Sequence, residues 1–100
     1  MPAIGKTAIK AITAGAEKPR WFWCQSGYSF VCVESVKTKN RKDYVVCYVL
    51  GSSDMNRKPM KIEPKLDDLV SKGLYPLLRG SVYMGMLERD LRALLDSKLP

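Results

Sequence analysis

Four cations lie within six consecutive residues and offer the clearest chemistry in this sequence. They are Lys37, Lys39, Arg41 and Lys42. A lysine ammonium binds phosphate as a point charge, and an arginine guanidinium can donate two parallel hydrogen bonds to phosphate oxygens. A second group, Arg57, Lys58 and Lys61, follows the next apolar run. We predict that these seven residues contact phosphates. The alternative is a solvated loop that prevents strand edges from aggregating.

Aromatic residues precede this basic segment, between residues 20 and 24. An exposed aromatic ring beside cations can stack on a nucleobase, which is worth about 1–3 kcal/mol per base. The candidates are Arg20, Trp21 and Trp23, with Tyr44 or Tyr48 joining them according to how the strands pair. The alternative is that both tryptophans fill the core beneath a helix.

Residue types suited to catalysis or metal binding are scarce. The sequence contains no His, the commonest general base and a frequent metal ligand. Cys24, Cys32 and Cys47 show no CxxC spacing and each lies in an apolar run, which predicts reduced, buried thiols rather than zinc ligands. We expect a non-enzymatic protein without cofactor or metal, although a metal-independent ribonuclease built from Lys, Arg and Tyr stays open.

Positive charge is concentrated in the first part of the chain. The 17 Lys and Arg residues and 10 Asp and Glu residues give a net charge of +7. Residues 1–62 carry eleven cations and four anions, whereas residues 63–100 carry six of each. An excess confined to one half predicts an acidic partner for that half. No segment has the length and apolarity of a secretory signal or a transmembrane helix, so we expect a cytoplasmic protein without membrane contact.

The basic half has the pattern of strands. Three runs rich in β-branched and aromatic residues, 20–24, 28–36 and 43–50, predict an antiparallel meander. Turn residues separate the first two runs, and the polar segment 37–42 is expected to be a loop. Residues 6–13 fit a fourth strand or a short helix, and we favour the strand.

The neutral half has the pattern of helices. Pro64 is suited to a helix start, Leu66 and Leu69 share a face, and Gly73 is suited to a helix end. A second helix is predicted over 81–98, with the alternative of a start after Gly85. Strands followed by helices give a single α+β domain, 1–100, with the helices on one face of the sheet.

The sequence allows more than one pairing of the strands, so it does not decide which face of the sheet is exposed. Pairing Cys24 with Tyr28 would place both tryptophans opposite the Phe22 face. In the second hairpin, Val36 can pair with Lys42 or with Asp43, and this choice decides which face the tyrosines join. Both faces carry apolar groups in either register. The face without helices would need the N-terminal segment, a second subunit or a ligand, so a homodimer is one expectation.

These observations favour a small basic intracellular module that binds nucleic acid through the cationic loop. The alternative is a protein-interaction module, such as an inhibitor or adaptor, that docks on an acidic protein surface.

Overall fold

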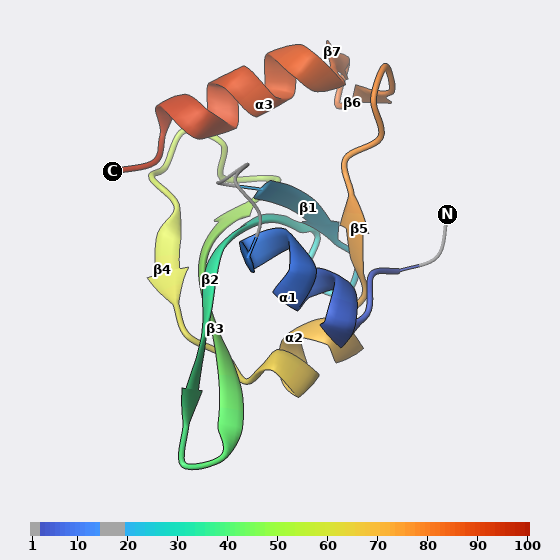
Figure 1. Ribbon diagram of the computed structural model, residues 1–100. Coiled ribbons are helices and arrows are strands. Elements are labelled where there is room, and N and C mark those ends of the chain that lie inside the picture. The colour runs from blue at the N-terminus through green and yellow to red at the C-terminus, as the bar shows by residue number, and fades with distance from the viewer. Residues whose placement is uncertain (1–2, 15–19) are drawn as a thin grey trace.

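The computed structural model describes residues 3–14 and 20–100 (Figure 1). Five antiparallel strands form the main sheet, in the order β4-β3-β2-β1-β5. They are β1 (Arg20–Cys24), β2 (Ser29–Lys39), β3 (Lys42–Gly51), β4 (Met60–Ile62) and β5 (Leu74–Pro76). The predicted three-stranded meander is confirmed as β1–β2–β3, and the short edge strands β4 and β5 are additions to it. Because Pro76 ends β5 and Pro59 precedes β4, each edge strand is limited to three residues.

The second hairpin is longer and tighter than predicted. Strand β2 continues through Lys39 and β3 starts at Lys42, which leaves a turn of only two residues. Asn40 and Arg41 both have positive φ, 52° and 63°, as a type I′ turn requires. The predicted loop over 37–42 is therefore wrong. Both proposed registers are also wrong, because Val36 pairs with Val45.

The first hairpin differs from the prediction by one residue. Cys24 pairs with Ser29 rather than with Tyr28. In this register Trp21 lies opposite Cys32 and Trp23 opposite Phe30, so these four side chains share one face of the sheet. The expected grouping of Phe30 with Phe22 is wrong.

Helices cover both faces of the sheet, so the prediction that they pack on one face is wrong. Helices α1 (Lys6–Ala14) and α2 (Leu66–Ser71) pack on the Phe22 face, and α3 (Glu88–Ser97) packs on the Trp21 face (Figure 1). The sequence analysis named the N-terminal segment, a second subunit or a ligand as the cover of the second face. In the structure the N-terminal segment covers it, together with α2. The architecture is α+β, with the predicted C-terminal helix against the sheet. Among the described residues, no helix is long and apolar enough to cross a membrane.

The N-terminal segment is a helix and not the favoured strand. Three of the nine residues of α1 are alanines, which have the highest helix propensity. Ile9 is fully buried against the sheet, where it belongs to a core cluster that also contains Phe22, Leu66 and Leu69. Burial of this one large side chain fixes the helix on the sheet.

The predicted helix over 81–98 is correct only from Glu88 onward. Residues before it form a small hairpin of β6 (Val82–Tyr83) and β7 (Met86–Leu87), whose turn residues Met84 and Gly85 have positive φ. This start agrees with the alternative of a helix that begins after Gly85. Gly73, with φ +78°, follows the end of α2 as predicted.

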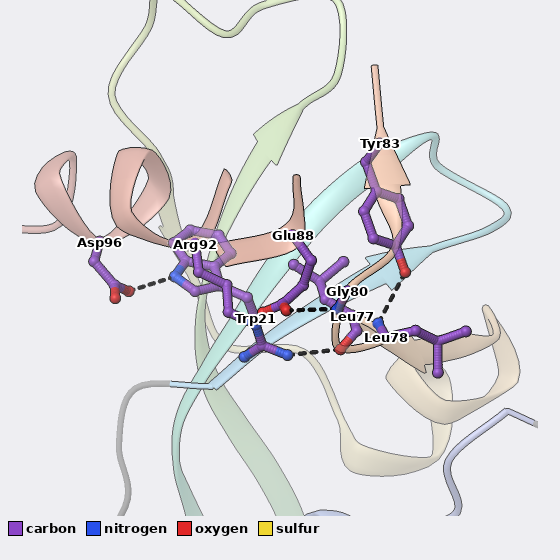
Figure 2. Close-up of polar contacts among 8 residues, drawn as sticks. All are labelled: Trp21, Leu77, Leu78, Gly80, Tyr83, Glu88, Arg92 and Asp96. Carbon is purple, nitrogen blue, oxygen red and sulfur yellow. Dashed lines mark hydrogen bonds and ion pairs between the residues drawn. The ribbon is translucent and has the colours of Figure 1, made fainter. Parts of the chain in front are cut away.

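Polar groups of α3 hold the connection between β5 and β6 in place (Figure 2). Glu88 forms an ion pair with Arg92, and its Oε1 accepts a hydrogen bond of 3.1 Å from the Gly80 amide. The Arg92 guanidinium donates to the Leu77 carbonyl at 2.7 Å. The β6–β7 hairpin therefore has a fixed position relative to the sheet.

Candidate nucleic-acid interface

One end of the Trp21 face extends beyond the part that α3 covers. Cys32 lies beneath α3, and Lys37 and Lys39 follow on the same strand. A β-bulge between Val33 and Ser35 keeps Lys37 on the same face as Cys32. Their partners on β3, Tyr44 and Tyr48, are four residues apart, so Lys37 is roughly 13 Å beyond Cys32 at about 3.3 Å per residue. Lys37 pairs with Tyr44 and Lys39 with Lys42, so each rung brings its two side chains to one face.

Strand β4 and the segment that follows it add two further cations to this face. Lys61 pairs with Tyr48, and Lys65 forms an isolated bridge with Tyr44. Because Lys42, Tyr44 and Tyr48 are separated by even numbers of residues on β3, their cross-strand partners point the same way. The basic face consists of Lys37, Lys39, Lys42, Lys61 and Lys65, all of which are exposed. Sequence reasoning missed Lys65, which it assigned to the neutral half.

Among the described residues, Glu63 is the one carboxylate that is ion-paired with the basic face. Its Oε1 accepts a hydrogen bond of 2.9 Å from the Lys37 ammonium. That bond, assisted by the charges of Lys61 and Lys39, holds the pKa of Glu63 below its usual value of 4.5. Within the described residues, the other four lysines of the basic face have no ion-pair partner.

The hairpin turn also borders a cleft of about 600 Å³ between α1, β3 and the start of α2. Five cations and three carboxylates line it: Lys6, Lys10, Arg41, Lys42, Lys65, Asp43, Asp67 and Asp68. Arg41, Lys42 and Lys65 belong to the turn or to the basic face as well. These three cations therefore extend the basic face around the turn to the edge of the cleft, where Lys6 and Lys10 lie among the three carboxylates.

Two ion pairs connect α1 to the rest of the cleft. Lys6 contacts Asp67 at 2.7 Å, and Lys10 contacts Asp43 at 2.6 Å. Hydrogen bonds from Lys10 and from the Thr38 hydroxyl lower the pKa of Asp43 below 3.8. The hydrogen bond to Asp67 raises the pKa of Lys6 above 10.5. The Lys6–Asp67 pair joins α1 to α2, and the Lys10–Asp43 pair joins α1 to the base of the hairpin.

The second predicted group of cations does not all join the first. Arg57 and Lys58 lie in the connection between β3 and β4, where they border a groove with Lys98 at the end of α3. Since Met60 pairs with Val49, this connection follows the end of β3 that is farther from the turn. Arg57 and Lys58 therefore lie roughly 20 Å from Tyr44 along the direction of the strand. Arg57 also contacts Asp54 at 3.9 Å.

The two tryptophans lie away from the basic face. Trp21 is only 2% exposed and packs under α3, with its Nε1 donating a 2.7 Å hydrogen bond to Asp96 (Figure 2). This is the core position that the sequence left as the alternative. Trp23 is half-buried, donates to Gln25, and contacts the rings of Phe30 and Tyr28 edge-on. The side chain of Arg20 lies outside the described residues.

The three cysteines are free and buried, as the sequence predicted. Each lies on a central strand. Burial raises the pKa of the Cys47 thiol to about 12, so it stays protonated at neutral pH. Within the described part of the chain, no three His, Cys, Asp or Glu side chains are placed to hold a metal ion.

No protein-family model, curated protein or solved structure matches this chain. What the protein does must therefore be inferred from its own side chains.

Proposed function

We propose that the protein binds nucleic acid, without catalysing a reaction, through the basic face and the turn of the β2–β3 hairpin. The observation that carries the proposal is that exposed cations without an ion-pair partner among the described residues come from separate segments and meet at one end of the sheet. Lys39, Arg41 and Lys42 come from the hairpin, and Lys61 and Lys65 come from β4 and the residues after it.

The arrangement carries an electrostatic penalty in the free protein. Lys39 and Lys42 are directly opposite each other on neighbouring strands, and like charges in such a pair are destabilising. Arg41 in the turn adds a third positive charge next to them. A polyanion relieves this repulsion and gains entropy by releasing the counterions condensed on its phosphates.

Lys61 and Lys65 distinguish this proposal from a simple solvated hairpin tip. Cations at a tip can be explained by protection against edge-to-edge pairing, which needs only the hairpin's own residues. Lys61 and Lys65 lie more than 18 residues further along the chain and still extend the same charged surface. Phosphate binding accounts for both groups.

The test compares two variants that remove the same number of charges. The first is Lys39→Gln, Arg41→Asn and Lys42→Gln, where asparagine tolerates the positive φ of position 41. The control replaces Lys72, Arg79 and Arg89, which lie outside the basic face, by glutamine. Binding of a fluorescent DNA duplex is followed by anisotropy at increasing NaCl concentrations.

The first variant is expected to lower the slope of log K against log[salt] by about 2 to 3, because each lost phosphate contact contributes about 0.9. The control is expected to change the slope by less than 1. Equal changes in both variants, or no binding by the unmodified protein, would contradict the proposal.

A specific observation also favours the second candidate, a protein-interaction module. The β6–β7 hairpin exposes Val82, Met84 and Leu87, with 62%, 54% and 42% of their surfaces accessible. Arg79 and Arg89 flank it in sequence and are exposed, so a partner with an apolar patch bordered by carboxylates would complement it. This function predicts a stoichiometric protein complex that survives nuclease treatment and is lost in the Val82→Ser, Leu87→Ser variant. A second copy of the chain in this role would appear as a dimer in sedimentation.

A further inference from the structure

We infer that the nucleic acid is a B-form DNA duplex and that the tip of the β2–β3 hairpin enters its major groove. This inference rests on the proposed function and specifies its substrate. It has three supports: the shape of the tip, the side chains that it carries, and the position of the aromatic rings.

The tip is a two-stranded ribbon, which α1 contacts through the Lys10–Asp43 ion pair. Within the described residues, β1 accompanies β2 only as far as Val33, and the last residue bridged to the outer side of β3 is Tyr44. From there through the turn, no other strand in the described part of the chain lies beside the ribbon. Figure 1 shows it projecting past both α1 and α2. From Tyr44 to the turn the free length is about 10 Å. The major groove of B-DNA is about 12 Å wide and 8.5 Å deep and admits such a ribbon.

The tip carries side chains that can contact both bases and phosphates. Asn40 and Arg41 occupy the turn itself, and neither has a side-chain partner within the described residues. An asparagine amide can pair with the edge of adenine, and an arginine guanidinium with the edge of guanine. Lys39 and Lys42 form the first rung behind the turn. In a groove this rung meets the phosphates that line it.

The aromatic rings argue against a single strand. Proteins that bind single strands stack bases on exposed rings next to their cations. Tyr44 and Tyr48 are half-buried, and Trp21 lies in the core. The one aromatic ring with a largely exposed surface, among the described residues, is Tyr28. It precedes β2 at the end opposite Lys39, so it cannot serve the same stretch of strand as the tip.

The geometry also discriminates between duplexes. A-form RNA has a deep and narrow major groove that side chains cannot read. A ribbon of this width therefore reaches base edges in B-DNA and only phosphates in duplex RNA. The protein should distinguish the two even though their charge densities are similar.

The first experiment measures binding of the unmodified protein to a random-sequence DNA duplex of about 20 base pairs, to one of its strands, and to the RNA duplex of the same sequence. The DNA duplex is expected to bind at least tenfold more tightly than either competitor. Dimethyl sulfate should then show protection of guanine N7, in the major groove, and no protection of adenine N3, in the minor groove.

The second experiment separates base reading from charge. Arg41→Lys keeps the positive charge but loses the forked donor, whereas Lys61→Gln removes a charge behind the tip. Sequence preference is measured by selecting tight binders from a randomised duplex library. Arg41→Lys is expected to reduce the preference at one guanine by about tenfold, in line with a bidentate contact. Lys61→Gln should weaken binding to all sequences equally.

The results distinguish major-groove binding from nucleic-acid binding in general. Equal affinity for the duplex, the single strand and duplex RNA, with the salt dependence intact, overturns the groove assignment and leaves nucleic-acid binding in place. Protection of adenine N3 alone also overturns it. Failure to bind any of the three probes overturns both.

Discussion

Replacing Lys39 by glutamate should make the free protein more stable while weakening its complex with nucleic acid. In the native hairpin Lys39 is directly opposite Lys42, next to Arg41 and two residues from Lys37 on the same face. The substitution converts a repulsive rung into an attractive one. It also removes the favourable influence of Lys39 on Glu63, but that carboxylate keeps its 2.9 Å contact with Lys37.

The magnitude follows from the exposure of the pair. Cross-strand charge pairs contribute roughly 0.2–1 kcal/mol, and exposed pairs lie in the lower part of that range. Reversing the sign of one charge removes a repulsion and adds an attraction of similar size. The net gain in the free energy of unfolding is therefore about 0.5–1 kcal/mol. For a chain of 100 residues this corresponds to a rise in Tm of about 2–8 °C.

Thermal unfolding followed by circular dichroism in low salt measures the effect, and 1 M NaCl should remove most of it, because the Debye length there is about 3 Å. Lys39→Gln should give about half of the gain. The double variant Lys39→Glu, Lys42→Glu restores a like-charged rung and should lose the gain. A lower Tm for Lys39→Glu, or a gain unaffected by salt, would refute the reasoning that the rung is under electrostatic strain.

Three further predictions concern the core and the α3 network. Trp21→Ala should lower the free energy of unfolding by about 3–5 kcal/mol, measured by urea titration, because the ring is buried and its hydrogen bond to Asp96 is lost; a loss below 1 kcal/mol would show that the ring is not part of the core. Glu88→Ala should cost about 2 kcal/mol in the same assay, since it leaves the partly buried Arg92 guanidinium without its carboxylate; a variant as stable as the parent would contradict the network in Figure 2. Stability should fall as pH rises above 9, because the unfolded chain releases the Cys47 proton near pH 9 while the folded chain holds it to about pH 12; Cys47→Ala should flatten that decline, and an unchanged slope would exclude this thiol as its source.

The parts of the fold that the sequence predicted are those with a long periodic pattern. The β-branched runs of β2 and β3 and the leucine spacing of α3 are each long enough for periodicity to be decisive. Strands β4 and β5 have three residues each, too few to show alternation. The β6–β7 hairpin was predicted as helix because Met84 and Leu87 happen to continue the spacing that leads to Leu91. The positive φ at Gly85 is the local feature that ends that pattern.

The candidate interface was predicted only in part, because a sequence shows which residues are near along the chain but not which distant residues meet in the fold. Lys37, Lys39, Arg41 and Lys42 are close in sequence, so their proximity in space follows from any hairpin. Lys65 joins them only through a single bridge to Tyr44, and nothing in its local sequence signals that contact. Conversely, Arg57 and Lys58 are near Lys61 in sequence but are carried away from the turn by the antiparallel direction of β4.

The register of the first hairpin has the largest functional consequence. With Cys24 opposite Tyr28, strand alternation would have separated both tryptophans from Phe30. With Cys24 opposite Ser29, they share its face, and α3 buries Trp21 there. A shift of one residue therefore removes a ring from the candidate stacking surface and places it in the core. The cations keep their position at the far end of β2 in either case, so neither tryptophan lies among them. That separation favours a duplex, whose bases are already stacked on one another, as the partner of this hairpin.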